Sequence, residues 1–135
     1  MRKLKFFQSI NEALYQSMKK SSKVLIMGLG VDDPKGIFGT TYGLKEKFGN
    51  SRVFDMPTAE NSMTGVAIGA SLSGFRPVMT HQRVEFALLA MEQIINQAAK
   101  WYYMNAGQMS VPLVIRIIVG RGWGNGPQHT QSLEA

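Results

Sequence analysis

The chain contains 135 residues with a mass of 15.0 kDa, enough for one domain with its own core but not for two. Hydrophobic residues make up 44% and charged residues 18%, a balance that excludes disordered and collagen-like chains, and the absence of cysteine excludes disulfides and thiolate metal sites. The formal charge of +6 arises before Val53, where ten basic residues accompany four acidic ones, whereas five of each follow. We interpret the basic half as a solvated helical surface, and we expect no nucleic-acid partner.

The sequence does not indicate a membrane protein. No apolar run approaches the roughly 20 residues that span a bilayer. The basic N-terminus is followed at once by polar residues, which makes it a poor signal peptide. We therefore expect no membrane partner and a cytoplasmic location.

Helical and extended patterns alternate along the chain. Apolar side chains recur every three or four positions from residue 4 to residue 20, which predicts a helix. Thr58 follows the break at Pro57 and is expected to cap the next long helix. In chain order we predict helix 4–20, strand 24–27, a turn over 32–36, helix 41–48, strand 52–55, helix 58–72, strand 76–80, helix 84–105 and strand 111–119. This alternation predicts a three-layer α/β domain with a mostly parallel sheet and helices on both faces.

Two segments carry more specific expectations. Strand 111–119 is almost continuously apolar apart from Arg116, as a buried parallel strand should be. The predicted helix 58–72 and the residue after it carry a stripe of small residues at spacings of three and four. This stripe either packs on the chain's own sheet or allows another helix to approach across an interface. The residues of the stripe are Ser62, Gly65, Gly69 and Ser73.

Several common site motifs are absent. Gly28-Leu29-Gly30 follows a strand, but the third glycine of a dinucleotide fingerprint is replaced by Asp33. The sequence contains no Gly-Lys-Ser/Thr phosphate loop and no Gly-x-Ser-x-Gly elbow. Two histidines without cysteine give no recognisable ligand spacing, so we predict no metal ligands. The glycine-rich segment 120–126 is interpreted as a flexible surface loop.

Glu60 is the most informative carboxylate. An acidic residue in a first helical turn is ordinarily explained by the helix dipole. Here, however, Glu60 is followed after four residues by Gly65-Val66 and after two more by Gly69. This spacing resembles the pyrimidine-binding-domain motif of thiamine-diphosphate-dependent enzymes. Further segments along the whole chain resemble beta subunits of 2-oxo acid dehydrogenases of the pyruvate, branched-chain and acetoin type: 42–44, 47–49, 52–57, 74–77, 93–100, 103–104, 107–108 and 129–135.

The resemblance implies a fold and a domain organisation. Such beta subunits are more than twice as long as this chain. Residues 1–135 are therefore expected to form the transketolase-like pyrimidine-binding domain, in the thiamine-diphosphate-binding fold, as the front portion of a longer protein. The C-terminal transketolase domain of the family is absent from the chain.

The resemblance also implies roles for four residues. Glu60 matches the catalytic, cofactor-binding glutamate that hydrogen-bonds N1′ of the aminopyrimidine, which favours the 4′-imino tautomer that takes the C2 proton. Phe86 matches the aromatic residue that packs on the aminopyrimidine, and Gln82 lies in the segment that walls the pyrimidine and acyl pocket. His129 matches a catalytic histidine that positions the 2-oxo acid or serves acyl transfer.

Further implications concern cofactors and partners. The cofactor would be thiamine diphosphate, with the diphosphate and Mg²⁺ held by an alpha-type subunit. Together with a second beta-type chain this gives a heterotetramer, which decarboxylates a small 2-oxo acid oxidatively and passes the acyl group to a lipoyl acyltransferase. The chain alone should be inactive.

Two alternatives remain open at this stage. The segment 80–85 is more polar than the apolar stretch typical of pyruvate or branched-chain enzymes, which favours an unusual substrate. A split transketolase-like enzyme that moves two-carbon units between sugars would suit this polarity. A truncated, non-catalytic scaffold that only binds partner chains is the second alternative.

Overall fold

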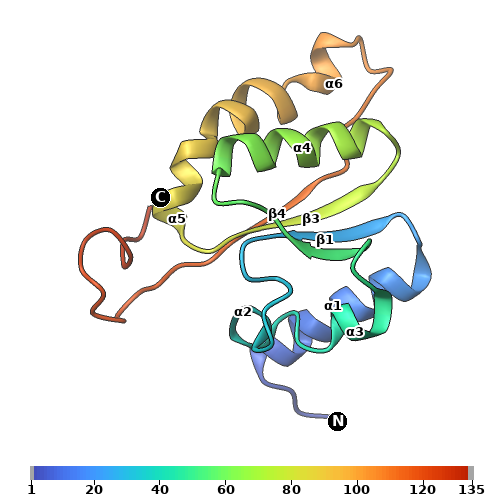
Figure 1. Cartoon of the computed structure of the whole chain (residues 1–135). Coiled ribbons are helices and arrows are strands. Elements are labelled where there is room, and N and C mark those ends of the chain that lie inside the picture. The colour runs from blue at the N-terminus through green and yellow to red at the C-terminus, as the bar shows by residue number, and fades with distance from the viewer. Residues whose placement is uncertain (1, 134–135) are drawn as a thin grey trace.

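The computed structural model describes residues 2–133 as a four-stranded parallel sheet between two layers of helices (Figure 1). The strands are β1 (Val24–Gly28), β2 (Val53–Asp55), β3 (Arg76–His81) and β4 (Val114–Ile117). Their spatial order is β2-β1-β3-β4, and every neighbouring pair is parallel. The predicted three-layer α/β class is therefore confirmed. None of the helices in the described part of the chain is long and apolar enough to cross a membrane.

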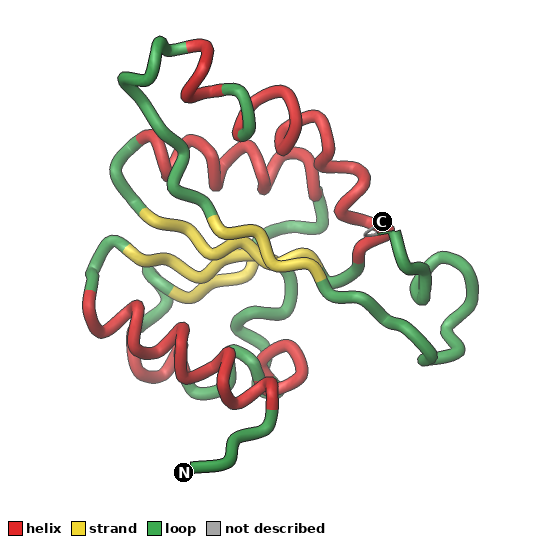
Figure 2. Tube along the Cα trace, turned by 180° about the vertical axis from the view of Figure 1, so that it is seen from behind, coloured by secondary structure: helices red, strands yellow, loops and turns green. Residues whose placement is uncertain are grey.

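The two helical layers come from different parts of the chain (Figures 1 and 2). One face of the sheet is covered by N-terminal helices and the other by helices from the middle of the chain. The first layer consists of α1 (Phe6–Lys20), α2 (Gly36–Gly39) and α3 (Leu44–Phe48). The second consists of α4 (Glu60–Leu72), α5 (Val84–Ala87), the short turns η1 (Leu88–Ala90) and η2 (Gln93–Ala98), and α6 (Trp101–Met104).

Alternating residues of the strands build two separate apolar clusters. Ile26, Val53 and Val78 pack with Leu14 and Met18 of α1 on one face. On the other face, a methionine-rich cluster packs under α4, and its buried members are Met27, Met63, Ala67 and Met79. Because successive side chains of a strand point to opposite faces, adjacent residues such as Ile26 and Met27 serve different layers.

Arg52 connects the first layer to the sheet. Its guanidinium donates hydrogen bonds to the carbonyls of Met18 (3.0 Å), Ser21 (2.7 Å) and Val24 (2.9 Å). It also lies 5.2 Å from the centroid of the Phe48 ring. The carbonyls of the last helical turn have no partner inside a helix. Arg52 thus satisfies the C-terminal end of α1 and fixes it to the start of β1.

Some predicted boundaries are wrong at the helix starts. The first helix begins at Phe6 rather than at residue 4, and Phe6 is 82% exposed. The buried residues of α1 are Leu14 and Met18, in the second half of the predicted apolar pattern. Thr58 is not a helix cap, because α4 begins at Glu60 and is preceded by Ala59. The amide of Ala59 donates to the carbonyl of Pro57 (2.8 Å) in a tight turn, which delays the helix by two residues.

The predicted helix 84–105 is present, but its hydrogen-bond pattern changes along its length while the backbone at each junction stays right-handed helical. It divides into α5, the 3-10 turn η1, the π-helical turn η2 and α6. In η2 the amide of Ala99 donates to the carbonyl of Ile94 (3.0 Å), five residues earlier, and this wider turn breaks the α-helical periodicity.

The expectation of a buried strand over 111–119 is also wrong. Only 114–117 pair with β3, and Val114 is 54% exposed because β4 is the edge strand of the described sheet. Part of the apolar composition of segment 111–119 is explained by packing against the rest of the domain, since Leu113 contacts the methionine-rich cluster under α4.

The small-residue stripe of α4 does not pack on the sheet. Met63, Thr64 and Ala67 occupy that face, whereas Gly69 is exposed. Gly65 approaches η2, because a Cβ placed on it would lie 3.2 Å from Oε1 of Gln93. The interpretation of the stripe as packing on the chain's own sheet is therefore wrong.

Candidate active site

The carboxyl ends of the strands converge on a cavity of about 510 Å³. Ligands of parallel α/β sheets bind at this edge. Three of the four predicted site residues, Glu60, Gln82 and Phe86, line the cavity. The remaining lining residues come from the loops that follow β1 and β2: Leu29, Gly30, Asp33, Asp55 and Thr58. The fold therefore brings together residues that lie up to 57 positions apart in the sequence.

Glu60 is the first residue of α4, and its side chain is 7% exposed. Among residues 2–133, no hydrogen bond or ion pair involves its carboxylate. A carboxylate at a helix N-terminus is stabilised by the dipole and by free amides of the first turn. A buried carboxylate that faces a cavity without a protein partner can accept a hydrogen bond from a bound ligand or share a proton with it.

His81, at the end of β3, supports the same helical turn. Its side chain is fully buried, and Nε2 lies 3.2 Å from Oγ1 of Thr64. The Thr64 hydroxyl donates its proton to the carbonyl of Glu60 (2.8 Å), so Nε2 of His81 must donate to Thr64 and Nδ1 remains an unpaired acceptor. Burial lowers the pKa of His81, which the nearby Glu60 charge opposes, and the ring is neutral near pH 7.

His129 is placed beside the cavity rather than in its wall. Its ring meets the edge of Phe86 in a T-shaped contact, with 5.3 Å between centroids. The segment that carries it is held by Glu85, whose Oε1 accepts a hydrogen bond from the amide of Gln131 (2.6 Å). This hydrogen bond is the main reason that the pKa of Glu85 lies below its ordinary value, and the charges of His129 and Arg83 add to it. Neighbouring residues of α5 thus hold both the ring and the backbone of the His129 segment.

The loop after β1 is held by Asp55, the last residue of β2. Its carboxylate accepts three backbone hydrogen bonds, from Gly30 (2.9 Å), Val31 (2.7 Å) and Asp32 (3.1 Å). Gly30 has a φ of +73°, and a Cβ there would lie 3.0 Å from Nε2 of Gln82. The loop therefore brings bare backbone to the cavity wall beside Gln82.

Sequence reasoning missed the supporting roles of Asp55, His81 and Glu85. Asp55 and His81 end strands on the ligand-binding side of the sheet, which is a signal that position alone could have given. Glu85 gave no such signal, because its partner Gln131 lies 46 residues away.

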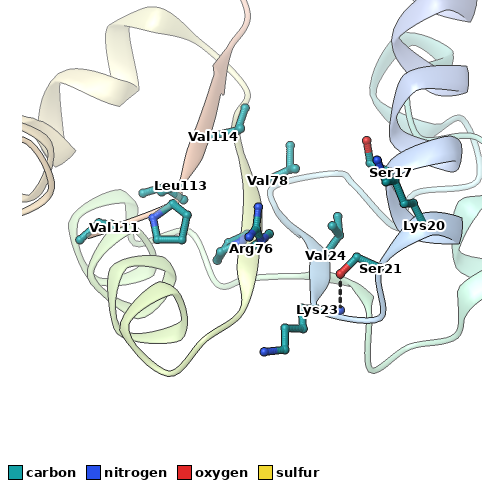
Figure 3. A pocket seen from close by; sticks show the side chains of 12 residues that line it. Ser17, Lys20, Ser21, Lys23, Val24, Arg76, Val78, Val111, Leu113 and Val114 are labelled. Carbon is teal, nitrogen blue, oxygen red and sulfur yellow. Dashed lines mark hydrogen bonds between the residues drawn. The ribbon is translucent and has the colours of Figure 1, made fainter. Parts of the chain in front are cut away.

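A larger cavity lies at the other end of the sheet (Figure 3). Its volume is about 750 Å³, and it separates the C-terminal end of α1 from the amino ends of β1, β3 and β4. Its walls combine aliphatic side chains, such as Val24 and Val78, with Lys20, Lys23 and Arg76 (Figure 3). It contains no carboxylate, histidine or aromatic side chain, and none of the predicted site residues lines it. We therefore locate the candidate site at the carboxyl ends, despite its smaller volume.

Comparisons with known proteins identify the family of the chain. Residues 2–135 match the family of the transketolase pyrimidine binding domain. The chain is 40% identical over all of its length to the pyruvate dehydrogenase E1 component subunit beta of Staurastrum punctulatum, of which it covers 41%. Over 98% of its length it is 39% identical to the 2-oxoisovalerate dehydrogenase subunit beta of Bacillus subtilis, of which it covers 40%. Over 90% of its length it is 43% identical to the mitochondrial pyruvate dehydrogenase E1 component subunit beta of Pisum sativum, of which it covers 34%.

These relatives extend beyond the aligned region, since the chain spans about two fifths of their length or less. The region matched to the family, residues 2–135, includes the whole described sheet and the cavity at its carboxyl edge. The family match over 2–135 and the parallel sheet together show that the chain belongs to the transketolase pyrimidine-binding-domain family.

Proposed function

We propose that this chain supplies the aminopyrimidine-binding half of a thiamine diphosphate site in the E1 component of a 2-oxo acid dehydrogenase. The observation that carries the proposal is the buried Glu60 carboxylate, which faces a cavity and has no hydrogen-bond partner among residues 2–133. An acceptor in that state fits a heterocyclic nitrogen that carries or shares a proton. The names of the relatives, pyruvate and 2-oxoisovalerate dehydrogenase beta subunits, support the enzyme class.

We propose a role for each site residue from the family resemblance together with its position. Glu60 would hold the shared proton at the ring nitrogen, and the Phe86 ring would pack on the face of the aminopyrimidine. Gln82 would form the opposite wall near Gly30. His129, at the edge of Phe86, would orient the 2-oxo acid. The bound cofactor would supply the electron sink for decarboxylation.

We propose that the remaining parts of the enzyme come from other polypeptide segments. An alpha-type subunit would hold the diphosphate and Mg²⁺, a second beta-type chain would complete a heterotetramer, and a lipoyl acyltransferase would receive the acyl group. The second helical layer, which contains α4 and α6, supports burial in such an assembly, because large apolar side chains are exposed along it. These are Val66, Leu88, Leu89, Ile95, Tyr102, Tyr103 and Met104. A C-terminal transketolase domain would be supplied outside these 135 residues.

The cytoplasmic location expected from the sequence stays a prediction. The Pisum sativum relative is named as a mitochondrial protein, so the family does not fix the compartment.

The test is the substitution Glu60→Gln in the chain joined to a C-terminal transketolase domain and combined with an alpha-type subunit. It keeps the size of the side chain but removes the carboxylate, so we expect turnover to fall by about 10²- to 10⁴-fold while the melting temperature changes little. Glu46→Gln, on the exposed side of α3, is the matched control and should leave turnover unchanged. Full turnover by Glu60→Gln would overturn the proposal. If adding the chain does not raise the affinity of the alpha-type subunit for thiamine diphosphate, the scaffold alternative is correct.

A further inference from the structure

A second, smaller cavity adjoins the candidate site. Its volume is about 280 Å³, and it shares three wall residues with the 510 Å³ cavity of the candidate site, namely Gly30, Asp33 and Gln82. The rest of its wall is formed by the cations Lys35 and Arg83 and by the apolar side chains of Ile37 and Phe38. We call this cavity the side pocket.

Arg83 is held in the wall of the side pocket by two aromatic rings. Its guanidinium carbon lies 4.8 Å from the centroid of Trp123 and 6.0 Å from that of Phe38. The two rings also contact each other, with 5.2 Å between centroids. Stacking of this kind fixes the plane of a guanidinium, so little conformational freedom remains to be lost when a ligand binds.

The donors of Arg83 are largely unused. Stacking covers the faces of the guanidinium but leaves its N–H groups in the plane free. Nη1 donates to the carbonyl of Gln82 (2.7 Å), and the buried Nε has no partner. Among residues 2–133, the ion pairs are Arg2 with Glu12 and Lys45 with Asp32, so neither Arg83 nor Lys35 is neutralised by one.

The balance of charge in the side pocket favours an anion. Lys35 and Arg83 outnumber Asp33, whose carboxylate already accepts a hydrogen bond from the amide of Lys35 (3.2 Å). A planar guanidinium with free in-plane donors suits a carboxylate or a phosphate group.

We infer that the side pocket binds a second anionic group of the substrate, at the end away from the reacting 2-oxo group. This inference rests on the proposed function, because the shared wall at Gln82 and Gly30 places the side pocket next to the cofactor cavity. The substrate class is thus a 2-oxo acid whose far end carries a carboxylate or a phosphate, rather than one with a short aliphatic chain.

The test measures binding to the full chain without cofactor or partner. Glutarate, glycerol 3-phosphate and acetate are titrated separately, and the indole N–H signal of Trp123 is followed by NMR. Trp101, the other tryptophan, lies in α6 and is an internal reference. We expect glutarate, glycerol 3-phosphate or both to bind at least about tenfold more tightly than acetate, as one additional charge-assisted hydrogen bond would give.

Variants separate the side pocket from general charge effects. Arg83→Met should abolish the preference for the dianion, whereas Arg83→Lys should keep part of it. Arg121→Met is the matched control, since Arg121 is exposed near Trp123 and lies outside the pocket wall. Binding of glutarate alone would assign a dicarboxylic substrate, and binding of glycerol 3-phosphate alone a phosphorylated one. Equal affinity for all three probes, or an unchanged preference in Arg83→Met, would overturn the inference.

The outcome is independent of the role proposed for Glu60. Glu60→Gln should bind the preferred dianion as tightly as the original chain does, because Glu60 does not line the side pocket. If turnover depends on Glu60 but the side pocket shows no preference for the dianions, only this inference is refuted. If the side pocket prefers a dianion but Glu60→Gln keeps full turnover, only the proposed function is refuted.

Discussion

Gly28 ends β1 at the edge of the candidate site and cannot accept a side chain. It has a φ of +143°, and a Cβ built on it would overlap the carbonyl oxygen of Thr80 and lie 2.8 Å from the Thr80 amide nitrogen. Both atoms belong to the backbone of β3, which pairs with β1 at this position. Gly28→Ala must therefore separate the carboxyl ends of the two central strands.

The cost of Gly28→Ala has two parts. The positive φ costs about 1–3 kcal/mol in a residue with a Cβ. Separation of the strands removes the hydrogen bond from Leu29 N to Thr80 O (3.2 Å), a loss of about 1 kcal/mol, and leaves buried groups unpaired. With the steric overlap added, we expect a loss of about 3–5 kcal/mol in unfolding free energy. For a domain of this size the melting temperature would fall by about 10–20 °C.

Two other glycines are controls for these contributions. Gly43 has a φ of +73°, and no neighbouring atom lies within 4 Å of the position that a Cβ would take, so Gly43→Ala measures backbone strain alone, about 1–2 kcal/mol. Gly69 lies inside α4 with open space around it, and Gly69→Ala should stabilise the domain by about 0.5–1 kcal/mol. Calorimetry of the three variants gives the comparison. A loss for Gly28→Ala no larger than that for Gly43→Ala would refute the steric argument.

Three further predictions concern the supports of the site and the sheet. Arg52→Met removes a charged donor shared by three carbonyls, so chemical denaturation should show a loss of about 2–4 kcal/mol, and an unchanged midpoint would contradict the bridging role. Burial holds the folded pKa of His81 below its ordinary value of 6.5, so the unfolding free energy should fall as the pH drops below 6.5 and level off below the folded pKa. His81→Phe should flatten this part of the pH profile. If the variant keeps the same slope, another group causes the pH dependence. Glu85→Leu should release the His129 segment from Phe86, seen as a loss of the ring-current shift of the His129 C–H signals, whereas Glu85→Gln keeps an acceptor for Gln131 and should retain most of that shift.

Local patterns determined the elements and their order. Short apolar runs bounded by turn or break signals identified the four strands, because strands buried between two helical layers are apolar on both faces. Apolar spacing of three and four identified the two long helical regions, because burial of one helical face imposes that spacing. The motif from Glu60 to Gly69 identified the family, since a short-range spacing on one helix survives in the sequence unchanged.

Other features depended on the tertiary structure. The exposure of β4 follows from its place at the edge of the sheet, which an apolar sequence around Val114 does not report. The contacts from Glu85 to Gln131, from His81 to Thr64 and from Arg83 to Trp123 join residues 17 to 46 positions apart. Such pairings are set by how strands and loops are placed in three dimensions, so the sequence alone named the site residues but not the groups that hold them.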